Sequence, residues 1–353
     1  MGGHGEVWSE RDTTPGAIEA ALRKLLREAH EHDQGHVPAR VLNLVAVVDR
    51  DWRGEVLNRL ERVGRYQASR LVLCAVEENR ETIDAEVAMT TEGEPKPGEF
   101  ALMHERVLLE VGRRHLPGLG TLVDPLVVPD IATLAWAPHG HPEALDSLLR
   151  LSQVVLIDSV NETDPAGAVR RAAQLAEHGY VVDLAWLRST PWRERVAASF
   201  DPPQWLPELS GISSVRVRHQ PDSAVAGLLF CGWLCSRLGW EPGSLSPANG
   251  MLRGRAKGRR QEVQLCLEPD PELDVPGLAG VAVGTASGMT ISLDRAPGGL
   301  SAQRCDSDGC QSAWTVLGAS RGEGGIMGEG IRQALLRDPT YRPALGAVEA
   351  MLD

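Results

Sequence analysis

Hydrophobic residues in the first half of the chain alternate between helical spacing and short continuous runs. Apolar residues three or four positions apart follow Thr14 and Pro15, and the same spacing recurs over residues 51–66, which predicts two amphipathic helices. Residues 40–49 and 69–76 are almost entirely apolar, as in strands that are covered on both faces. A strand, a helix and a second strand in this order form a βαβ unit, so we expect the two strands to be parallel.

The rest of the first half extends this unit into a mixed sheet. Apolar and polar residues alternate over 83–89 and 100–111 on either side of a Gly- and Pro-rich stretch (GEPKPGE), which predicts an antiparallel hairpin. We expect residues 1–12 to be irregular. The further elements expected here are helices at 113–128 (interrupted near Pro117), 142–150 and 164–179, and strands at 131–136 and 153–158.

The second half has a different pattern. A strand at 213–217 precedes a strongly apolar helix at 223–240, which we expect to be buried. Short alternating runs then predict strands at 251–260, 262–268, 280–283, 289–294, 302–305 and 313–317. A Gly- and Ser-rich loop is expected at 321–330, before a final helix over 330–352. The second half is therefore predicted to be an α+β module in which a helix packs on an antiparallel sheet.

Between the two modules lies the segment 183–201 (DLAWLRSTPWRERVAASFD), which combines tryptophans, arginines and apolar residues at helical spacing. Thr190 followed by Pro191 is a helix start signal, so we expect two short helices broken near Ser189–Pro191. The predicted domains are an N-terminal α/β domain (1–180), a helical connector (181–210) and a C-terminal α+β domain (211–353). The connector is either a core-facing element or a Trp/Arg surface that binds a partner protein.

Composition and charge exclude several classes of protein. The chain has 353 residues, of which 42% are hydrophobic and 24% charged, as in a globular protein with two domains. Its net charge of −12 argues against nucleic acid as the main partner, because phosphate binding needs a cationic surface. No apolar run reaches the roughly 20 residues of a membrane span. The first residues lack the basic and apolar regions of a secretory signal, so we expect a cytoplasmic protein.

Motifs for catalysis and for cofactor binding are missing from the sequence. It contains no GxxxxGK[ST], no strand followed by GxGxxG and no HExxH. His139 and His141 follow a predicted strand near Asp130 and Asp146, but loop histidines are usually only solvated. We therefore expect no catalytic residue, no metal and no cofactor. The alternative is a small-molecule enzyme or sensor that uses the loop from Asp130 to His141, because open α/β sheets bind ligands at strand ends.

Two further groups of residues could bind or react. Cys305 and Cys310 flank an Asp-Gly turn and could face each other across a hairpin, where a disulfide could act as a redox switch. Cys231 and Cys235, by contrast, lie on the apolar helix and are expected to be core residues. A basic cluster is expected to share one strand face, either as a charged edge strand or as a patch that binds an anion or an acidic partner. The cluster consists of Arg253, Arg255, Lys257 and Arg259.

Several stretches, in their order along the chain, resemble a known family. RVLNLVAVVD, SRLVLCAV, LVVPDIATLAWAPHG, VVLIDS and above all DLAWLRSTPWRERVAASFD are similar to the glucose-6-phosphate dehydrogenase assembly protein (OpcA) family. The apolar helix ending in SRLGW and the stretch EVQLCLEP resemble the second domain of that family. The resemblance covers residues 39–294, and the motif at 183–201 is long enough to be specific.

The resemblance implies a non-enzymatic cytosolic protein that assists the assembly of glucose-6-phosphate dehydrogenase or acts as its allosteric effector in the oxidative pentose phosphate pathway. The family is linked in photosynthetic relatives to thioredoxin-dependent control, which makes thioredoxin a second candidate partner. Within the segment 183–201, we expect the dehydrogenase to be bound by Trp186, Arg188, Trp192 and Arg193.

Overall fold

The structure is a computed structural model that describes residues 7–32, 36–37, 41–64, 69–91, 101–161, 164–306, 309–317 and 322–353. The chain divides into two compact units, each described here by itself. Unit 1 comprises Met1–Ile157 and His178–Val182, and unit 2 comprises Asp158–Glu177 and Asp183–Asp353. This division differs from the predicted boundaries at residues 180 and 210, because Asp183 and the helices that follow it group with the second unit.

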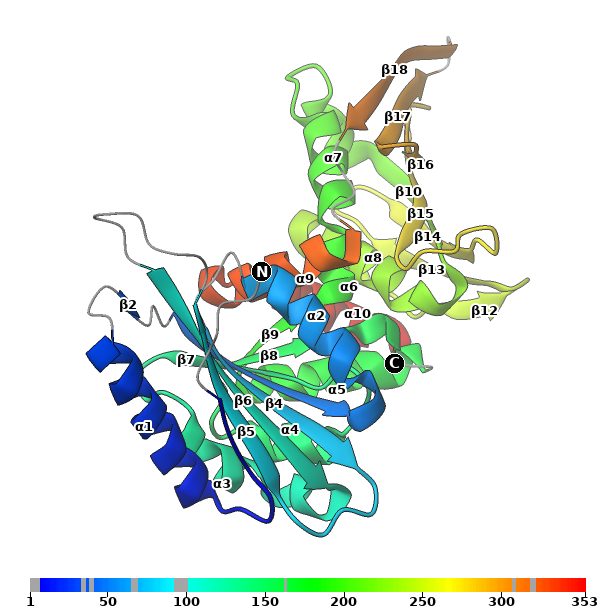
Figure 1. Ribbon diagram of the computed structural model, residues 1–353. Coiled ribbons are helices and arrows are strands. Elements are labelled where there is room, and N and C mark those ends of the chain that lie inside the picture. The colour runs from blue at the N-terminus through cyan, green and yellow to red at the C-terminus, as the bar shows by residue number, and fades with distance from the viewer. Residues whose placement is uncertain are drawn as a thin grey trace. The chain divides into compact units, whose positions relative to one another are not determined.

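Unit 1 is built on a nine-stranded mixed sheet (Figure 1). Strands β6, β4, β3, β7 and β8 are parallel and lie side by side in that order, with β9 next to β8. This is the strand order of a doubly wound sheet, in which the order reverses between β3 and β7. The antiparallel strands β5 and β1 continue the sheet beyond β6. The strands are β1 (Val7–Glu10), β2 (His36–Val37), β3 (Leu42–Asp49), β4 (Ser69–Glu77), β5 (Asp84–Thr91), β6 (Ala101–Gly112), β7 (Ala132–Trp136), β8 (Val154–Ile157) and β9 (Tyr180–Asp183).

The helices of unit 1 connect these strands. The connections from β3 to β4 and from β7 to β8 run in opposite directions along the sheet. Because both crossovers are right-handed, they place α2 and α4 on opposite faces. Seven of the eight residues of β3 are buried, as the continuous apolar run predicted. The helices are α1 (Pro15–His32), η1 (Arg50–Trp52), α2 (Arg53–Gly64), η2 (Arg113–Gly118), α3 (Leu119–Val123), η3 (Asp124–Leu126) and α4 (Pro142–Leu148).

Three details of unit 1 differ from the prediction. Residues 7–10 form a strand, because they pair with β5, whereas residues 1–12 were expected to be irregular. β9 was not predicted, since four residues carry too little periodicity to be recognised. The expected helix at 113–128 is three short helical pieces. The predicted hairpin is confirmed as β5 and β6, and its Gly- and Pro-rich turn lies outside the described residues.

Unit 2 contains a second nine-stranded sheet, in the order β11-β13-β14-β10-β15-β16-β17-β18 with β12 paired to β13. One pair departs from the predicted antiparallel arrangement: β10 and β14 are parallel, because the chain returns to the sheet through a helix between them. The strands are β10 (Ile212–His219), β11 (Glu241–Pro242), β12 (Ser246–Ala248), β13 (Met251–Lys257), β14 (Glu262–Pro269), β15 (Leu278–Thr285), β16 (Thr290–Ala296), β17 (Gly299–Asp306) and β18 (Gly309–Leu317).

The central helix of unit 2 is α8, which is apolar on nearly all sides and is covered by the sheet and by α10. Gly239 ends it in the left-handed conformation, with φ of 65°. The helices of this unit are η4 (Ser159–Asn161), α5 (Pro165–His178), α6 (Leu184–Arg188), α7 (Thr190–Phe200), η5 (Leu206–Gly211), η6 (Pro221–Ser223), α8 (Ala224–Leu238), α9 (Gly322–Leu336) and α10 (Tyr341–Leu352).

The end of the chain was predicted incorrectly. The stretch expected to be a loop at 321–330 lies mostly in α9, and the single helix expected at 330–352 is divided between α9 and α10. Glycine disfavours an isolated helix, but burial of Met327 and Ile331 offsets this cost in α9. Pro339 lies between the two helices and cannot donate the backbone hydrogen bond that a continuous helix would need.

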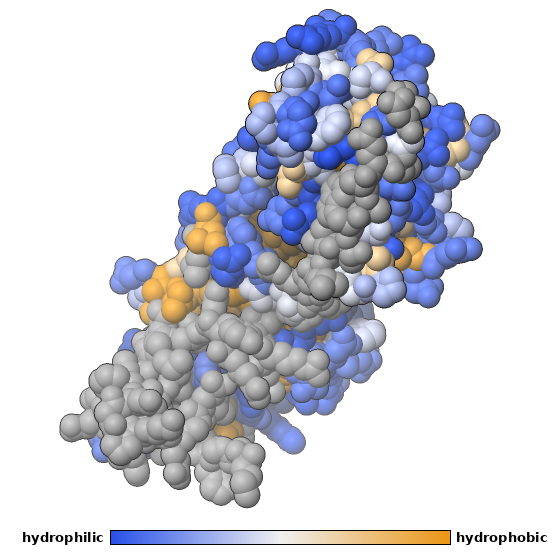
Figure 2. Space-filling model, turned by 90° about the horizontal axis from the view of Figure 1, so that it is seen from above, coloured by the Kyte–Doolittle hydropathy of each residue, from blue (hydrophilic) through white to orange (hydrophobic). Residues whose placement is uncertain are grey.

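The exposed hydrophobic residues of the described chain are scattered. Large apolar side chains that are exposed include Trp52, Leu206, Val275 and Leu336. Figure 2 shows a face on which the described residues are mostly hydrophilic, with hydrophobic residues in small separate patches. None of the described helices is long and apolar enough to cross a membrane.

Helix α8 packs so closely against α10 that adding one methyl group at Gly232 should destabilise unit 2. A Cβ atom at Gly232 would lie 2.3 Å from the carbonyl oxygen of Ala344 and 2.7 Å from Val348 Cγ2. We expect Gly232→Ala to lower the free energy of unfolding by about 1–3 kcal/mol, because the two helices must separate. Urea unfolding followed by tryptophan fluorescence measures this change.

The matched control is Gly346→Ala on α10, where an added Cβ would meet nothing within 4 Å. This exposed helical position should gain about 0.5–1 kcal/mol, since alanine is the better helix former. Equal effects of the two substitutions would contradict the close approach of α8 and α10.

Candidate functional site

The segment 183–201 begins with a buried aspartate. Asp183 caps α6 by accepting hydrogen bonds from the backbone N–H groups of Ala185 (2.9 Å) and Ser159 (3.2 Å) on Oδ1. Its Oδ2 accepts a hydrogen bond of 3.1 Å from the hydroxyl of Tyr341, the first residue of α10. The side chain therefore joins the start of α6, η4 and α10, and only 1% of the residue is exposed.

A second carboxylate lies close to Asp183. Asp158 is held by Arg188 through two hydrogen bonds of 2.7 Å, one to each carboxylate oxygen. Both side chains of this pair are largely buried, as is favoured for a planar guanidinium that binds a carboxylate with two donors. Burial and the charge of Asp158 raise the pKa of Asp183 to about 6. Two carboxylates and one guanidinium thus share this interior region.

Trp186 is the centre of a second cluster. Its indole N–H donates a hydrogen bond of 2.8 Å to Asp338, and the ring of Tyr341 meets it edge-on at 5.5 Å. The guanidinium carbon of Arg193 lies 3.4 Å from the centre of the indole ring, in a cation–π contact. Such a contact contributes about 2 kcal/mol when it is removed from water.

Arg193 is itself mostly removed from solvent. It donates hydrogen bonds to the carbonyl of Trp186 and to the hydroxyl of Thr190, and it lies 3.9 Å from Asp338. Burial lowers its pKa to about 10, although the charges of Asp338 and Glu194 oppose this shift. Asp338 would have a raised pKa from burial alone, but hydrogen bonds from Thr340 and Trp186 and the charge of Arg193 lower it.

The four side chains predicted to bind the dehydrogenase therefore lie inside unit 2. Trp186 and Trp192 are each 2% exposed, and the side chains of Arg188 and Arg193 are 7% and 8% exposed. The two short helices are confirmed as α6 and α7, although the residue at the N-cap of α7 is Ser189 and not Thr190. Because these side chains contact one another and the C-terminal helices, we expect their replacement to act through the fold of unit 2.

Four residues of this arrangement were not predicted from the sequence: Asp158, Asp183, Asp338 and Tyr341. Asp183 precedes a helix, which is a local signal for a cap. Asp338 and Tyr341 lie 152 and 158 residues away from their partners Trp186 and Asp183. No local pattern carries information about contacts over that distance.

The alternative site, predicted as a loop from Asp130 to His141 in unit 1, contains β7 itself. The part after β7 lies where the doubly wound sheet reverses its strand order. His141 lies 2.9 Å from Asp49, the last residue of β3, and Trp52 stacks on His139 at 5.1 Å between ring centres. Burial lowers the pKa of His139. The ends of β3 and β7 are thus joined by two side-chain contacts.

In dinucleotide-binding sheets, the pyrophosphate binds where the strand order reverses, on a glycine-rich turn after the first strand. Here β3 continues into the short helix η1 with Asp49, Asp51 and Trp52 at this position. Carboxylates would repel phosphate, and bulky side chains replace the glycines. No group of three or more metal-binding side chains occurs among the described residues.

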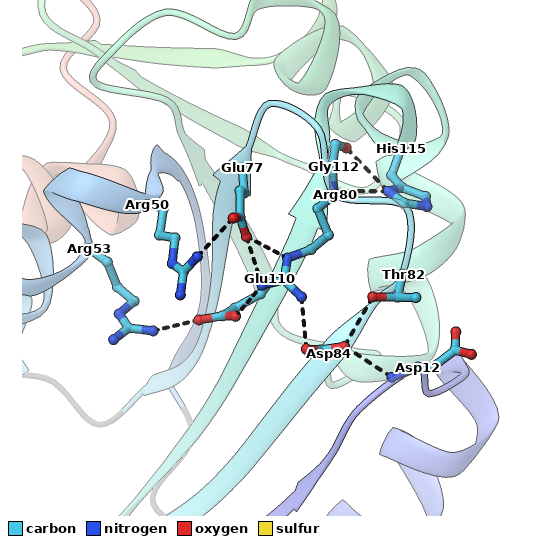
Figure 3. Close-up of polar contacts among 10 residues, drawn as sticks. All are labelled: Asp12, Arg50, Arg53, Glu77, Arg80, Thr82, Asp84, Glu110, Gly112 and His115. Carbon is cyan, nitrogen blue, oxygen red and sulfur yellow. Dashed lines mark hydrogen bonds and ion pairs between the residues drawn. The ribbon is translucent and has the colours of Figure 1, made fainter.

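The end of β4 is occupied as well (Figure 3). Glu77, at the position where such sheets bind ribose, accepts hydrogen bonds or ion pairs from Arg50 at 2.9 Å and Arg80 at 2.7 Å. Arg80 also binds Asp84 and Glu110, each at 2.8 Å. Burial alone would lower the pKa of Arg80, but these hydrogen bonds and charges raise it. Arg80 therefore links β4, β5 and β6, because it binds one carboxylate on each strand.

The predicted basic cluster lies on β13 and in the turn after it. Arg253, Arg255 and Lys257 are exposed at alternate positions, as predicted, on one face of the strand. The strand ends at Lys257, so Arg259 lies in the turn and not on the strand face, which corrects the prediction. β13 is also not at the edge of the sheet, because it pairs with β14 on one side and with the short strands β11 and β12 on the other.

The predicted hairpin of Cys305 and Cys310 is formed by β17 and β18. The backbone register places Cys305 opposite Cys310, and Cys305 is disulfide-bonded. The side chain of Cys310 lies outside the described part of the structure. Cys74, Cys231 and Cys235 are free thiols in the interior, and burial raises the pKa of each.

Titration of Asp183 predicts a pH-dependent stability. Its pKa in the folded protein (about 6) lies above the ordinary value of 3.8, so the folded state holds the proton more tightly than the unfolded state. The resulting stabilisation is complete below pH 3.8 and is lost as the pH rises through 6. Asp183→Asn keeps a side-chain oxygen for the cap but cannot titrate. Between pH 4 and 7, urea unfolding should show that the unmodified chain loses about 2 kcal/mol more than the variant.

Asp183→Ala serves as the control, because it removes both the titration and the cap. It should be less stable than Asp183→Asn at each pH, by about 1 kcal/mol for the lost cap. An identical pH dependence of the unmodified chain and Asp183→Asn would show that Asp183 does not carry the effect.

Comparison with known proteins assigns both halves of the chain to one family. The family profile described as glucose-6-phosphate dehydrogenase subunit N-terminal domain matches residues 61–174. The profile described as the C-terminal domain of the same subunit matches residues 179–345. Together the two profiles cover most of the two units.

Curated relatives carry the name OxPP cycle protein OpcA. The protein from Synechococcus elongatus is 27% identical over 274 residues, which cover 76% of this chain and 58% of the relative. The protein from Synechocystis is 22% identical over 290 residues, or 80% of this chain and 59% of the relative. The chain thus spans less than two thirds of the length of these relatives.

Among solved structures, apo scyllo-inositol dehydrogenase from Lactobacillus casei matches with a TM-score of 0.45 and 11% identity, over 89% of this chain and 96% of that one. The two family profiles and the curated relatives agree with the motifs noted in the sequence. The chain belongs to the glucose-6-phosphate dehydrogenase assembly protein (OpcA) family.

Proposed function

We propose that the protein binds glucose-6-phosphate dehydrogenase in the cytoplasm and promotes its assembly or acts as its allosteric effector, without catalysing a reaction itself. The observation that carries the proposal is the match of two dehydrogenase-subunit profiles to consecutive parts of the chain. The name of the curated relatives refers to the OxPP cycle, which agrees with a role in the oxidative pentose phosphate pathway.

The chemistry of the described sites supports binding over catalysis. Asp183, Asp158 and Asp338 are each engaged by a specific donor, namely Tyr341, Arg188 and Trp186. These pairs hold α6 and α10 in place. Asp183 is 1% exposed and the side chain of Asp158 is 10% exposed, so a substrate would not reach them, whereas the side chain of Asp338 is partly exposed. In unit 1, Arg80 is surrounded by the carboxylates that it binds.

Mixing the purified chain with the dehydrogenase from the same source tests the proposal. We expect the two proteins to co-elute in size-exclusion chromatography, and we expect the KM for glucose 6-phosphate or the oligomeric state of the dehydrogenase to change. Binding at the interface must stabilise one state of the dehydrogenase over another for either change to occur. If the proteins neither associate nor alter the kinetics, the proposed function is wrong.

A second candidate function is small-molecule binding at the ends of β3 and β7. Trp52 is 47% exposed at this position, beside His139, and an exposed indole ring can stack on a sugar or a base. A test on the chain alone separates the two functions. A sugar or a nucleoside bound at this site would raise the melting temperature of the chain without the dehydrogenase.

We further propose that the Cys305 disulfide is a redox switch and that thioredoxin is its reductant. Cys305 is partly exposed, whereas Cys74, Cys231 and Cys235 are buried. Reduction by a dithiol would convert the disulfide into two thiols, and the dithiol would become a disulfide. Maleimide labelling of the native chain should therefore add two labels after treatment with reduced thioredoxin.

Cys305→Ser is the matched variant, because it prevents this disulfide from forming. In this variant, the reductant should add no maleimide label at the hairpin. The variant should affect the dehydrogenase as the reduced chain does, whether or not reductant is present. Equal labelling of the oxidised and the reduced chain would rule out the switch.

A further inference from the structure

One face of the sheet in unit 2 is not covered by helices in the described part of the chain. Helix α8 packs against β10 and β14, and α7 contacts β16, so these helices account for the covered face. Inward side chains such as Val215, Val283 and Ile291 are at most 1% exposed. The side chains between them along the same strands are partly or fully exposed, which shows that the second face is open.

The open face is low over β15 and β16 because its side chains there are small. The strand register aligns a row of residues across six strands, and the neighbouring row contains Arg216, Ala282 and Ser292. A Cβ atom at Gly284 would lie 2.6 Å from the hydroxyl of Ser214, so the backbone of β15 is approached closely there. The row consists of Arg255, Gln264, Ser214, Gly284, Thr290 and Cys305.

The size of this face suits a protein partner. Six strands are separated by five spacings of about 4.8 Å, which gives a width of ~24 Å, and strands of about eight residues are ~26 Å long. The flat area is therefore ~600 Å², close to the ~800 Å² that each partner contributes to a standard protein interface.

One end of this face is positively charged, whereas the chain as a whole is negatively charged. Arg253, Arg259 and Arg260 are exposed at one end of the sheet and make no ion pair among the described residues. Arg255 and Lys257 contact Glu262 and Glu241 at exposed positions, where such pairs contribute little. A chain with a net charge of −12 thus concentrates unpaired arginines at one end of an open sheet.

The carboxylates of the same face are already engaged. Glu262 binds Arg255, Glu268 lies 3.8 Å from Arg216, and Asp294 binds Arg218. A second copy of this face would therefore offer the unpaired arginines few free carboxylates. On the face that Figure 2 shows, the hydrophobic patches are small and separate. The large exposed apolar side chains of the described residues are scattered along the chain, so charge and shape are the features available for recognition.

We propose that the open face of the unit 2 sheet is the docking surface for a flat, carboxylate-rich surface of a partner protein. Guanidinium groups bind carboxylates with two parallel donors, so the arginines at the β13 end orient the partner. The small side chains of β15 and β16 let the partner approach the sheet closely. The inference rests on the proposed function in one respect, because the dehydrogenase is the protein that supplies this surface.

Charge reversal at the exposed arginines tests the docking surface. Arg253→Glu combined with Arg259→Glu places like charges opposite the partner, so we expect the Kd for the dehydrogenase from the same source to rise at least ~tenfold at low salt. Ser292→Glu, at the centre of the face, should have the same effect by adding both bulk and charge. Calorimetry with the full-length chain measures the Kd, and circular dichroism and the melting temperature show whether each variant is folded.

The matched control is Arg237→Glu combined with Arg342→Glu. These exposed arginines on α8 and α10 make no ion pair among the described residues, and their reversal changes the net charge by the same amount. The Kd of this control should stay within ~twofold of the unmodified chain, because charges remote from an interface are screened by salt.

Each outcome decides between the proposals. No binding by the unmodified chain overturns the proposed function and, with it, this inference. Normal binding by both the arginine variant and Ser292→Glu overturns the inference alone. If these variants instead lose self-association in sedimentation while they still bind the dehydrogenase, the face is occupied by a second copy, which also overturns the inference.

Discussion

The interior of unit 2 depends on pairing buried carboxylates and guanidinium groups with specific partners. Removing a carboxylate or a guanidinium from water costs several kcal/mol unless hydrogen bonds or an opposite charge replace the lost hydration. Asp158 has Arg188 on both of its oxygens, and Asp183 has two backbone donors and the hydroxyl of Tyr341. These contacts define where α6 and α10 lie, because moving either helix would leave a charge unpaired.

Trp186 and Arg193 also make contacts that fix the connection between α9 and α10. The guanidinium lies over the indole ring, while the indole N–H binds Asp338 in the short connection between the two helices. The residues that best identify the family in the sequence are thus those that hold the C-terminal helices in place. These residues are buried and contact one another, so a strong motif need not be a contact surface.

Unit 1 has the strand order of a dinucleotide-binding sheet but different side chains at the positions that would hold the ligand. Asp49 and Trp52 stand where glycines would allow phosphate to approach, and Glu77 is bound by arginines of the same unit. A fold of this kind can therefore serve as a scaffold. The open sheet of unit 2, with its unpaired arginines, is the surface that best fits the proposed role of a binding protein.

The sequence by itself determined the types of most elements and the family, because these depend on local periodicity and on motifs that are continuous in the chain. The run from Leu42 to Asp49 and the apolar stretch of α8 could each be recognised from neighbouring residues alone. Only the tertiary structure decided that Trp186 and Arg193 face inward, that α9 is helical despite its glycines, and that β10 pairs in parallel with β14. Those outcomes depend on contacts between residues far apart in the chain, whose burial and pairing energies exceed the local preferences that a sequence pattern reports.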